Sequence, residues 1–395
     1  MMRCSKCIYP SNHPFGLTFN EKNICSGCLI HQEKFDLNWE NRFELLKTKV
    51  DIYKGSGDYH CIVPIKGTPE YFYLLDIVKN KLGLNPLCVS FNSQFNSQVG
   101  IKNFDLLRDT FDVDLIHYTS NPNIYKKLIR ESITKLNSMR WPYLAGEKQF
   151  PVQLAIEMNI PLIIWPFYQA TEQAGVHSYT EEIEMTRRSR HQFDLMGIEP
   201  HELINIGSLI SKSDIEDLNY PSNKNISKLN LKGIYLDNYI PWDSRILSEK
   251  MIKNFSAFSA RNTRTFDTYD RTDDMTYMTI HDIIKYAKLG YSRVTDNLCR
   301  EIRFNRISRD DALTIEKYYQ SYYPKEQIEY FLKWIGIQTK SFEWILDRLP
   351  YENCYDNNIT LNKEQKLFID SFVVNTEDVH STSDYIIFGK GLYTT

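Results

Sequence analysis

No run of about 18 consecutive apolar residues occurs in this chain of 395 residues, so no membrane-spanning helix is expected. The first ten residues, MMRCSKCIYP, contain no apolar core like that of a secretory signal peptide. We therefore expect a cytoplasmic protein whose cysteines are metal ligands or free thiols. A basic excess is lacking too, because the formal net charge is −3. This argues against a broad nucleic-acid-binding surface.

Glycine is scarce in one short turn. Residues 60–75, HCIVPIKGTPEYFYLL, predict a buried strand that runs into a helix, where nucleotide-binding α/β proteins place a glycine-rich phosphate loop. This turn has one glycine, Gly67, and Pro69 lacks the N–H that a phosphate would need. Thr68 is the expected N-cap, with Pro69 at the first helical position and Gly83 past the helix end. Taken alone, the turn is typical of an ordinary strand–helix connection.

Strands and helices alternate in the first 240 residues. Their hydrophobic patterns predict strands at 59–65, 84–92, 113–120, 160–167 and 233–240. Helices are expected at 36–56, 69–83, 98–112, 121–139, 150–159 and 179–197. Mostly helices follow, at 275–290, 295–304, 308–322, 325–335 and 339–348, with a capping box at Ser308. The pattern predicts an α/β fold with a parallel sheet covered on both faces, followed by a helical C-terminal region.

Four cysteines lie close together near the N-terminus. CSKC at 4–7 and CSGC at 25–28 are separated by 17 residues. Two such pairs can place four thiolates tetrahedrally around one zinc ion, which would be structural because no coordination position is left open. The predicted ligands are Cys4, Cys7, Cys25 and Cys28.

The remaining cysteines and the nearby histidines are assigned no ligand role. We interpret His13 and His31 as surface residues, and Cys61 and Cys88 as core thiols in apolar strands. Cys299 and Cys354 are scattered. The expected domains are a zinc knuckle (1–35), an α/β domain (36–240), a helical domain (241–350) and a tail of unassigned role (351–395).

Several stretches together resemble the N-acetyl sugar amidotransferase family, the PseA-type enzymes of surface-polysaccharide and nonulosonic-acid pathways. The similarity runs from about residue 3 to about residue 350. It is carried by CSKCIYPSNHPFGLTFNEKNICSGC, KLGLNPLCVSFN, VGIKNFDLL, VQLAIEMNIPLIIW, YIPWD and KLGYSRVTDNLCREIRFNRISRDDAL. The resemblance implies a sheet of the adenine-nucleotide α-hydrolase (PP-loop) type.

The resemblance also implies a chemistry. ATP, with Mg²⁺, would adenylylate the amide oxygen of an N-acetyl sugar or sugar nucleotide. Ammonia from a separate glutaminase subunit would then displace AMP and leave an acetamidino group. Such reactions contribute to surface glycans such as lipopolysaccharide, capsule or flagellin glycan. A homo-oligomer is compatible with this reading.

The family's phosphate loop, S-G-G-x-D-S, aligns with Lys66 to Tyr71. Gly67 is kept, and Glu70 keeps the charge of the aspartate, whereas both serines are replaced. Lys66 and Glu70 are the candidate catalytic residues, and Gly67 and Thr68 the candidate cofactor-binding residues. The acid expected soon after the IIW stretch is also missing, and the nearest is Glu172.

Three functional alternatives follow from these departures. The protein is an active amidotransferase with a variant loop, a degenerate homologue that acts as a binding or scaffold subunit without ATP chemistry, or an enzyme of another transfer reaction on an N-acetylated sugar. A zinc-ribbon RNA-modifying enzyme is a further possibility, against which the net charge counts.

A second group of candidates lies in GYSRVTDNLCREIR. Gly290, Arg293 and Asp296 correspond to the family pattern and are the candidate substrate-binding residues. Asp296, Arg300 and Arg303 fall on one helical face, where guanidinium groups suit phosphates. A salt-bridged face between two domains is the alternative.

Three further clusters carry weaker signals. TFDTYDRTDDMTYMTIH, with four aspartates and His281, is interpreted as a solvated loop, with a metal site as the alternative. Trp242 and Asp243 of YIPWD line a pocket or close a core. The arginines of EMTRRSRHQF are interpreted as a charged helix face.

Overall fold

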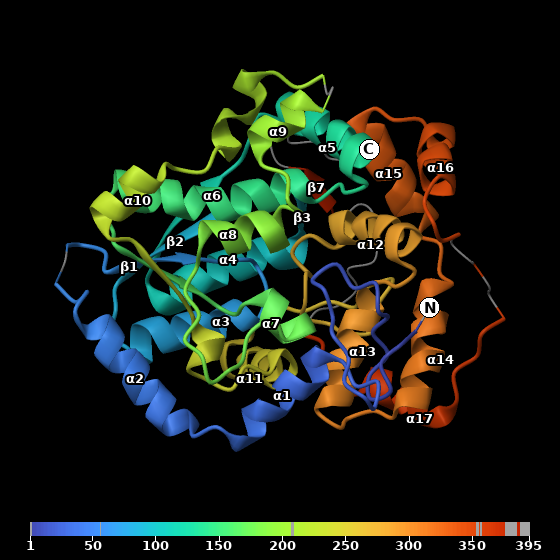
Figure 1. Cartoon of the computed structure of the whole chain (residues 1–395), viewed down its shortest axis with the longest axis horizontal. Helices are drawn as coiled ribbons and strands as arrows, with labels where there is room; N and C mark the ends of the chain where they lie inside the picture. Colours follow the sequence, from blue (N-terminus) through green and yellow to red (C-terminus); the bar gives the residue numbers. More distant parts are fainter. Residues whose placement is uncertain are drawn as a thin grey trace.

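The computed structural model describes residues 2–55, 57–206, 209–352, 355, 358–375 and 385–387. Cys354 and most of the tail after 375 lie outside these residues. The described part confirms the predicted class: a parallel sheet with helices on both faces, followed by a helical C-terminal region (Figure 1). No helix among these residues is long and apolar enough to cross a membrane.

Five parallel strands form the central sheet, in the order β4-β2-β1-β5-β6. They are β1 (Cys61–Pro64), β2 (Pro86–Phe91), β4 (Asp114–Tyr118), β5 (Leu162–Trp165) and β6 (Lys232–Tyr235). The chain reverses its direction of winding between β1 and β5. In open parallel sheets this reversal leaves a crevice beyond the carboxyl ends of the two strands, where ligands bind.

The side chains of the strands alternate between two cores. Cys61, Val63 and Ile164 face one core, which they share with α2 (Trp39–Asp51), α3 (Glu70–Leu75), α4 (Gln98–Phe111) and α11 (Ser244–Phe255). Ile62 and Ile163 face the opposite core, against α6 (Trp141–Glu157) and α10 (Asn223–Leu229). Because both faces are covered, β1 and β5 are apolar and buried along their whole length. Cys61 and Cys88 are fully buried core thiols, as predicted.

The α/β part contains the following helices, several of which cover these two faces. They are α1 (Ser26–Asp36), α2 (Trp39–Asp51), α3 (Glu70–Leu75), the π-helix η1 (Asp76–Lys81), α4 (Gln98–Phe111), α5 (Pro122–Leu136), α6 (Trp141–Glu157), α7 (Gln169–Ala174), α8 (Arg187–Ser189), the π-helix η2 (Arg190–Asp194), α9 (Pro200–Asn205), the 3-10 helices η3 (Lys212–Leu218) and η4 (Leu236–Asn238), α10 (Asn223–Leu229) and α11 (Ser244–Phe255).

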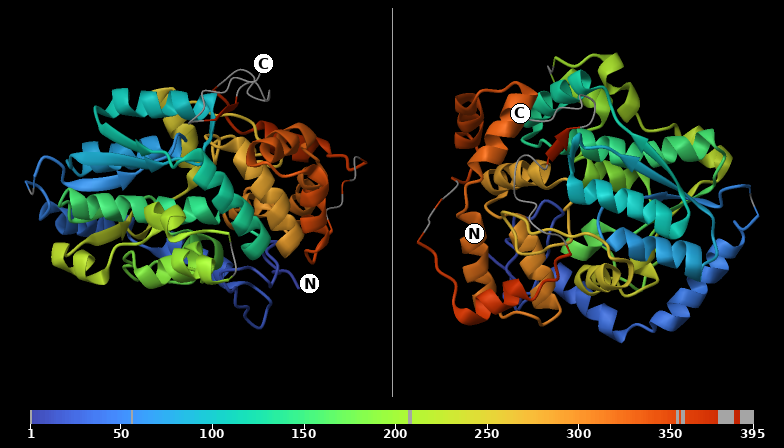
Figure 2. Two further views of the ribbon diagram at one scale, coloured as in Figure 1. Left: turned by 90° about the horizontal axis from the view of Figure 1, so that it is seen from above. Right: turned by 180° about the vertical axis from the view of Figure 1, so that it is seen from behind.

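The C-terminal region packs beside the sheet rather than on it, as Figure 2 shows from two further directions. It comprises α12 (Met275–Leu289), α13 (Arg293–Arg303), α14 (Arg309–Gln320), α15 (Lys325–Ile335), α16 (Thr339–Asp347) and α17 (Lys363–Asp370). A two-stranded pair, β3 (Phe95–Ser97) with β7 (Tyr385–Ile387), joins the two regions. The predicted helices 275–290 and 325–335 are confirmed within one residue at each end.

Two local predictions are wrong. The charged segment 179–197 is helical only over 187–194, because Met185 donates its N–H to the carbonyl of Gly233 and Glu184 bridges Ile234 beside β6. Thr68 does not cap α3, since its buried hydroxyl has no hydrogen-bond partner among the described residues. Pairing with the distant strand β6 prevents the first part of 179–197 from forming a helix. Burial of the Thr68 hydroxyl away from partners prevents capping, and local sequence shows neither effect.

Candidate functional site

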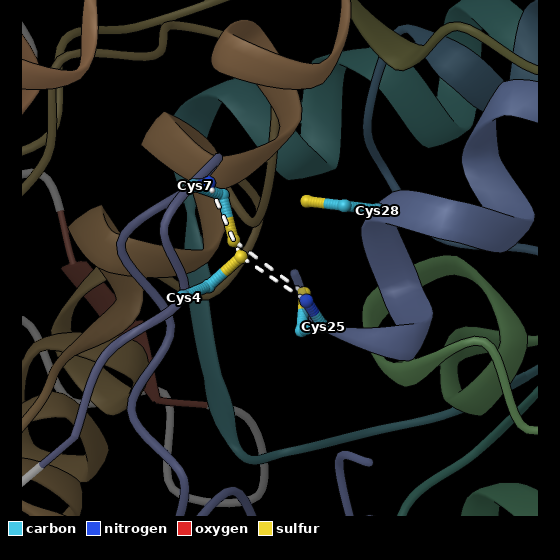
Figure 3. A group of neighbouring side chains, drawn as sticks. All are labelled: Cys4, Cys7, Cys25 and Cys28. Carbon is cyan, nitrogen blue, oxygen red and sulfur yellow. Dashed lines mark hydrogen bonds between the residues drawn. The ribbon is translucent and has the colours of Figure 1, made fainter. Parts of the chain in front are cut away.

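The four N-terminal cysteines converge on one point. Cys4 and Cys7 lie on a loop, Cys25 and Cys28 lie at the start of α1, and their side chains point toward one another (Figure 3). All four sulfur atoms lie within 4.8 Å of one another. A tetrahedral zinc site with bonds of about 2.3 Å requires sulfur atoms about 3.8 Å apart. The Sγ atoms of Cys7 and Cys25 are 3.7 Å apart, so the residues fit a metal ion.

Backbone donors surround the sulfur of Cys4. The N–H groups of Lys6, Cys7 and Cys25 point at it from 3.4, 3.4 and 3.2 Å. Hydrogen bonding with Cys25 lowers the pKa of the Cys28 thiol to about 6, whereas burial raises that of Cys7. Four thiolates this close require positive charge nearby, which a bound cation supplies.

Arg303 provides further positive charge at this cluster. Its Nη2 lies 3.8 Å from the Cys25 sulfur and donates to the carbonyl of Gln173 at 2.8 Å. Burial opposes its charge, but the neighbouring thiols raise its pKa well above the ordinary value. A Cβ on Gly27 would stand 2.2 Å from Arg303 Nη2 and 2.3 Å from the Gln173 oxygen. Glycine in the second knuckle therefore permits close contact between α1, α7 and α13.

His13 and His31 are buried, with 4% and 3% exposure, so their assignment to the surface is wrong. His13 stacks on Tyr291, with ring centroids 5.6 Å apart, and His31 meets the ring of Phe304 edge-on. Burial lowers the pKa of both, that of His31 to about 3. Tyr291 and Phe304 are far from the two histidines in the chain, so local sequence does not reveal these contacts.

Two adjoining cavities lie beyond the carboxyl ends of the sheet strands. The first touches Pro64, Phe91 and Trp165, the last residues of β1, β2 and β5. The second is lined by helices α12 and α13, and by Tyr9 of the cysteine-rich segment. Both share Glu70, Phe167, Gln169, Asp270 and Arg271. The crevice of the α/β sheet thus continues to the C-terminal helices.

Lys66 and Glu70 of the predicted loop line this cleft, as does Thr68. Lys66 forms an ion pair with Glu147 of α6 and lies over the ring of Tyr143. Burial opposes ionisation of Glu147, but the charges of Lys66 and Lys148 hold its pKa below the ordinary range.

Glu70 lies where the two cavities meet. Its carboxyl is nearly buried, with 9% of the residue exposed. Burial and the charge of Asp270 raise its pKa to about 7. A carboxyl group with this pKa can either give up or accept a proton near neutral pH.

Gly67 does not line either cavity, and other parts of the chain close around it. Its N–H donates to Oδ2 of Asp273 at 3.2 Å, and its carbonyl accepts from Asn103 at 2.9 Å. A Cβ on Gly67 would lie 2.3 Å from the carbonyl oxygen of Gly100, which itself lies against Asp273. Close backbone packing against Gly100 requires glycine at this position. The carboxylate of Asp273 accepts the hydrogen bond from the Gly67 N–H that a phosphate would accept in a phosphate loop.

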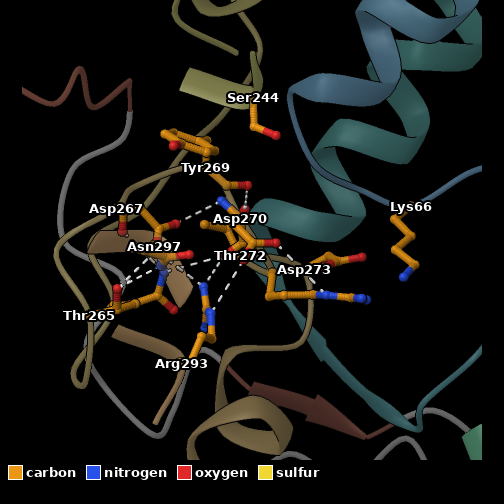
Figure 4. Close-up of polar contacts among 12 residues, drawn as sticks. Lys66, Ser244, Thr265, Asp267, Tyr269, Asp270, Thr272, Asp273, Arg293 and Asn297 are labelled. Carbon is orange, nitrogen blue, oxygen red and sulfur yellow. Dashed lines mark hydrogen bonds and ion pairs between the residues drawn. The ribbon is translucent and has the colours of Figure 1, made fainter. Parts of the chain in front are cut away.

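The aspartate-rich loop is buried, so the solvated-loop interpretation is wrong. Asp267 is fully buried and accepts hydrogen bonds from Thr265 and Asn297. Arg293, the first residue of α13, forms ion pairs with both Asp267 and Asp270 at 3.4 Å (Figure 4). Lys66 lies to one side of this network in that view. Helix α13 covers the loop, and ion pairs with Arg293 take the place of the hydrogen bonds that water would make to the aspartates.

Two of the three candidate substrate-binding residues line the second cavity, and the third does not. Arg293 and Asp296 both line the second cavity, whereas Gly290 does not. Asp296 accepts a hydrogen bond from Tyr9 at 3.0 Å and pairs with Lys285. Gly290, with a φ of 72°, ends α12 and packs against the ring of Tyr351.

The other sequence candidates have structural partners. Glu172 pairs with Lys34 of α1 at 2.6 Å, which outweighs burial and lowers the pKa of Glu172 to about 2. Trp242 is buried in the core shared with β1, and Asp243 caps α11. Arg190 is buried and forms an ion pair with Glu199 at 2.7 Å, rather than lying on a charged face.

Sequence reasoning missed three charged side chains that line the cleft, from Glu147, Arg140 and Arg271. Arg271 lies within the aspartate-rich segment, whose charge density was the available signal. Glu147 and Arg140 sit among aromatic residues at the start of α6, where no motif marks them. Among the described residues, only the four cysteines gather closely enough to hold a metal ion.

Comparison with known proteins agrees with a role in glycan biosynthesis. Residues 253–367 match the family described as LPS biosynthesis protein WbpG-like, C-terminal domain. This region contributes Asp270, Arg271, Arg293 and Asp296 to the cleft. An uncharacterized protein of Methanocaldococcus jannaschii is 30% identical over 120 residues, which are 29% of this chain. The match spans 42% of that relative, less than half of its length. The chain is therefore similar to glycan biosynthesis proteins through its helical C-terminal region.

Proposed function

We propose that this chain is an N-acetyl sugar amidotransferase that works in surface glycan biosynthesis. One observation carries the proposal: the WbpG-like region and the end of β1 line a continuous cleft, so Arg293 and Asp296 share it with Lys66 and Glu70. The proposed substrate is an N-acetylated sugar, free or nucleotide-linked. We also propose that the cysteine cluster holds a structural zinc ion, which the sulfur spacing supports.

In the proposed reaction, the amide oxygen of the N-acetyl group attacks the α-phosphorus of ATP, and pyrophosphate leaves. Ammonia, supplied by a glutaminase subunit, then attacks the amide carbon. AMP leaves with the former amide oxygen, and the product carries an acetamidino group. Adenylylation is needed because an amide oxygen is otherwise a poor leaving group.

The residues of the cleft suit parts of this reaction. Lys66 offers a cation to the phosphate oxygens at the end of β1, beside the N-terminus of α3. Glu70, with a pKa raised to about 7, can accept the proton that the attacking ammonia must lose. The buried walls exclude water from the activated amide.

Calorimetric titration with ATP and Mg²⁺ tests the proposal. We expect micromolar binding to the zinc-loaded protein, weakened at least about tenfold in Lys66→Ala through loss of a charge-assisted contact. Glu70→Ala should keep the fold and still release pyrophosphate from ATP in the presence of an N-acetyl sugar, while abolishing formation of the acetamidino product when ammonia is supplied. Lys253→Ala, on the exposed face of α11, is the matched control.

A folded protein that binds no ATP up to millimolar concentration would contradict this function. The second candidate, a binding subunit without ATP chemistry, would then gain support. It is favoured by the Asp273 carboxylate at the Gly67 N–H, since a phosphate would have to displace that carboxylate. Binding of UDP-N-acetylglucosamine without any ATP binding would identify this case.

A further inference from the structure

The second cavity contains more positive than negative charge. Four carboxylates line it, from Glu70, Glu172, Asp270 and Asp296. Six basic side chains line it, from Arg140, Arg271, Lys285, Arg293, Arg300 and Arg303. Most of these groups already have partners: Lys285 pairs with Asp296, Arg293 pairs with Asp270, and Glu172 pairs with Lys34.

Arg140 is without such a partner. It precedes α6, is 7% exposed, and forms no ion pair with any residue that the structure describes. Its Nε and Nη2 atoms are buried without a hydrogen-bond partner. The ring of Tyr143 lies 5.7 Å from its guanidinium carbon. A buried guanidinium left in this state destabilises the fold, so its presence calls for a ligand.

Arg271 faces the same cavity from the aspartate-rich loop. Its Nη1 atom is also buried without a partner, and its nearest carboxylate contact, with Asp270, is long at 3.8 Å. Its backbone has a φ of 56°, a conformation that side-chain-bearing residues rarely adopt and that clusters at ligand sites. Burial and the positive charge of Arg271 both lower the pKa of Arg140, so the two guanidinium groups repel one another.

Burial opposes the charge of Arg271, but Asp274 and Glu147 raise its pKa well above the ordinary value. None of the nearby acids forms an ion pair with Arg140 among the described residues. Glu147 is engaged by Lys66, and Asp270 by Arg293. Burial and the neighbouring Asp273 raise the pKa of Asp274 to about 7, so this carboxyl is only partly charged at neutral pH. His281, on the adjacent face of α12, adds a buried Nδ1 atom without a partner among the described residues.

We infer that Arg140 and Arg271 form an oxyanion site in the second cavity, adjoining the Lys66 turn, that holds an anionic group of the substrate. Guanidinium groups match carboxylate and phosphate oxygens in paired hydrogen bonds. The shared chemistry is a planar or tetrahedral oxyanion, either a sugar carboxylate or a sugar-linked phosphate. The site itself does not depend on the amidotransferase reaction; only the identification of the anion as part of an N-acetyl sugar rests on the proposed function.

Thermal unfolding with simple anions tests the site. Pyrophosphate and UDP represent the phosphate source, and glucuronate represents the carboxylate source. We expect at least one to raise the unfolding temperature of the full-length, zinc-loaded protein in a saturable way. Arg140→Gln and Arg271→Gln should weaken that response about tenfold to a hundredfold, the usual effect of losing a charge-assisted pair. Arg108→Gln, an exposed position on α4, removes the same charge and should leave the response unchanged.

Two further readouts distinguish this site from other roles. Without ligand, Arg140→Gln should unfold at a higher temperature than the wild type, because it removes a buried unpaired charge; a purely structural arginine would give the opposite. ATP binding should persist in Arg140→Gln but weaken in Lys66→Ala, so failure of the proposed function and failure of this site can be told apart. The inference is overturned if no anion stabilises the wild type at 10 mM, about ten-thousandfold above a dissociation constant of about 1 µM, or if both arginine variants respond as the wild type does.

Discussion

The cysteine-rich segment and the turn from Lys66 to Tyr71 are both short motifs, yet only the first has the environment that its sequence predicts. The four cysteines depend on contacts within 28 residues, and their sulfur atoms meet as expected. The turn depends on Asp273, which is 206 residues away in the chain and occupies the Gly67 N–H. A motif is informative when its chemistry is complete within itself, and less so when a distant segment can change what surrounds it.

The largest effect is expected at the cysteines. Cys25→Ser should lose the bound metal and lower the free energy of unfolding by more than about 4 kcal/mol, because the metal replaces a core that this short segment cannot build. Metal content by elemental analysis and chemical unfolding measure both effects. Cys88→Ala, a buried thiol in β2, should keep one metal per chain at a cost of about 1 kcal/mol. Equal metal content in the two variants would contradict the assignment.

A smaller effect is expected at the turn. Gly67→Ala should lower the free energy of unfolding by about 1–3 kcal/mol even without nucleotide, because the added Cβ would lie 2.3 Å from the Gly100 oxygen. Urea unfolding of the ligand-free protein measures the change. If Gly67 were kept only for phosphate approach, the variant would be as stable as the wild type and would lose nucleotide binding alone.

The pH dependence of the free energy of unfolding tests the environment of Glu70 in the turn. Burial raises the pKa of Glu70 from its ordinary 4.5 to about 7, so the folded state holds this proton more tightly than the unfolded state. The contribution of Glu70 to stability therefore falls as the pH rises from about 4.5 to about 7. Glu70→Gln should match the wild type near pH 5 and exceed it by up to about 2–3 kcal/mol at pH 8, from the 1.36 kcal/mol per pKa unit.

Urea unfolding of both proteins at the two pH values provides this measurement. Glu326→Gln, an exposed change of the same kind on α15, is the control. A difference between Glu70→Gln and the wild type that does not vary with pH would show that Glu70 is ionised throughout, with its charge balanced by the neighbouring arginines.

Much of the fold follows from local pattern. Hydrophobic runs locate all five strands of the sheet, and capping by Ser308 and the left-handed Gly290 bound α14 and α12 as expected. The crossed order of the strands follows from tertiary pairing, and the antiparallel bridge beside β6 overrides the helical pattern near Met185.

The candidate site was predictable only where side chains come from one segment. Lys66 and Glu70 both line the cleft, because both belong to the turn after β1. Arg140 and Arg271 come from segments 131 positions apart and match no spacing rule. They are singled out because buried nitrogen atoms of both guanidinium groups have no hydrogen-bond partner among the described residues, which is seen only in the folded structure.

The contacts of the cysteine-rich segment also bear on the order of assembly during synthesis. Tyr9 bonds to Asp296 and Arg3 to Glu316, across 287 and 313 positions of the chain. A ribosome releases the cysteines long before it makes the helices that cover them. The nascent segment can bind the proposed metal ion early, but its apolar side must stay uncovered until α13 and α14 emerge. This interval makes it the part of the chain most exposed to aggregation and to thiol oxidation while translation continues.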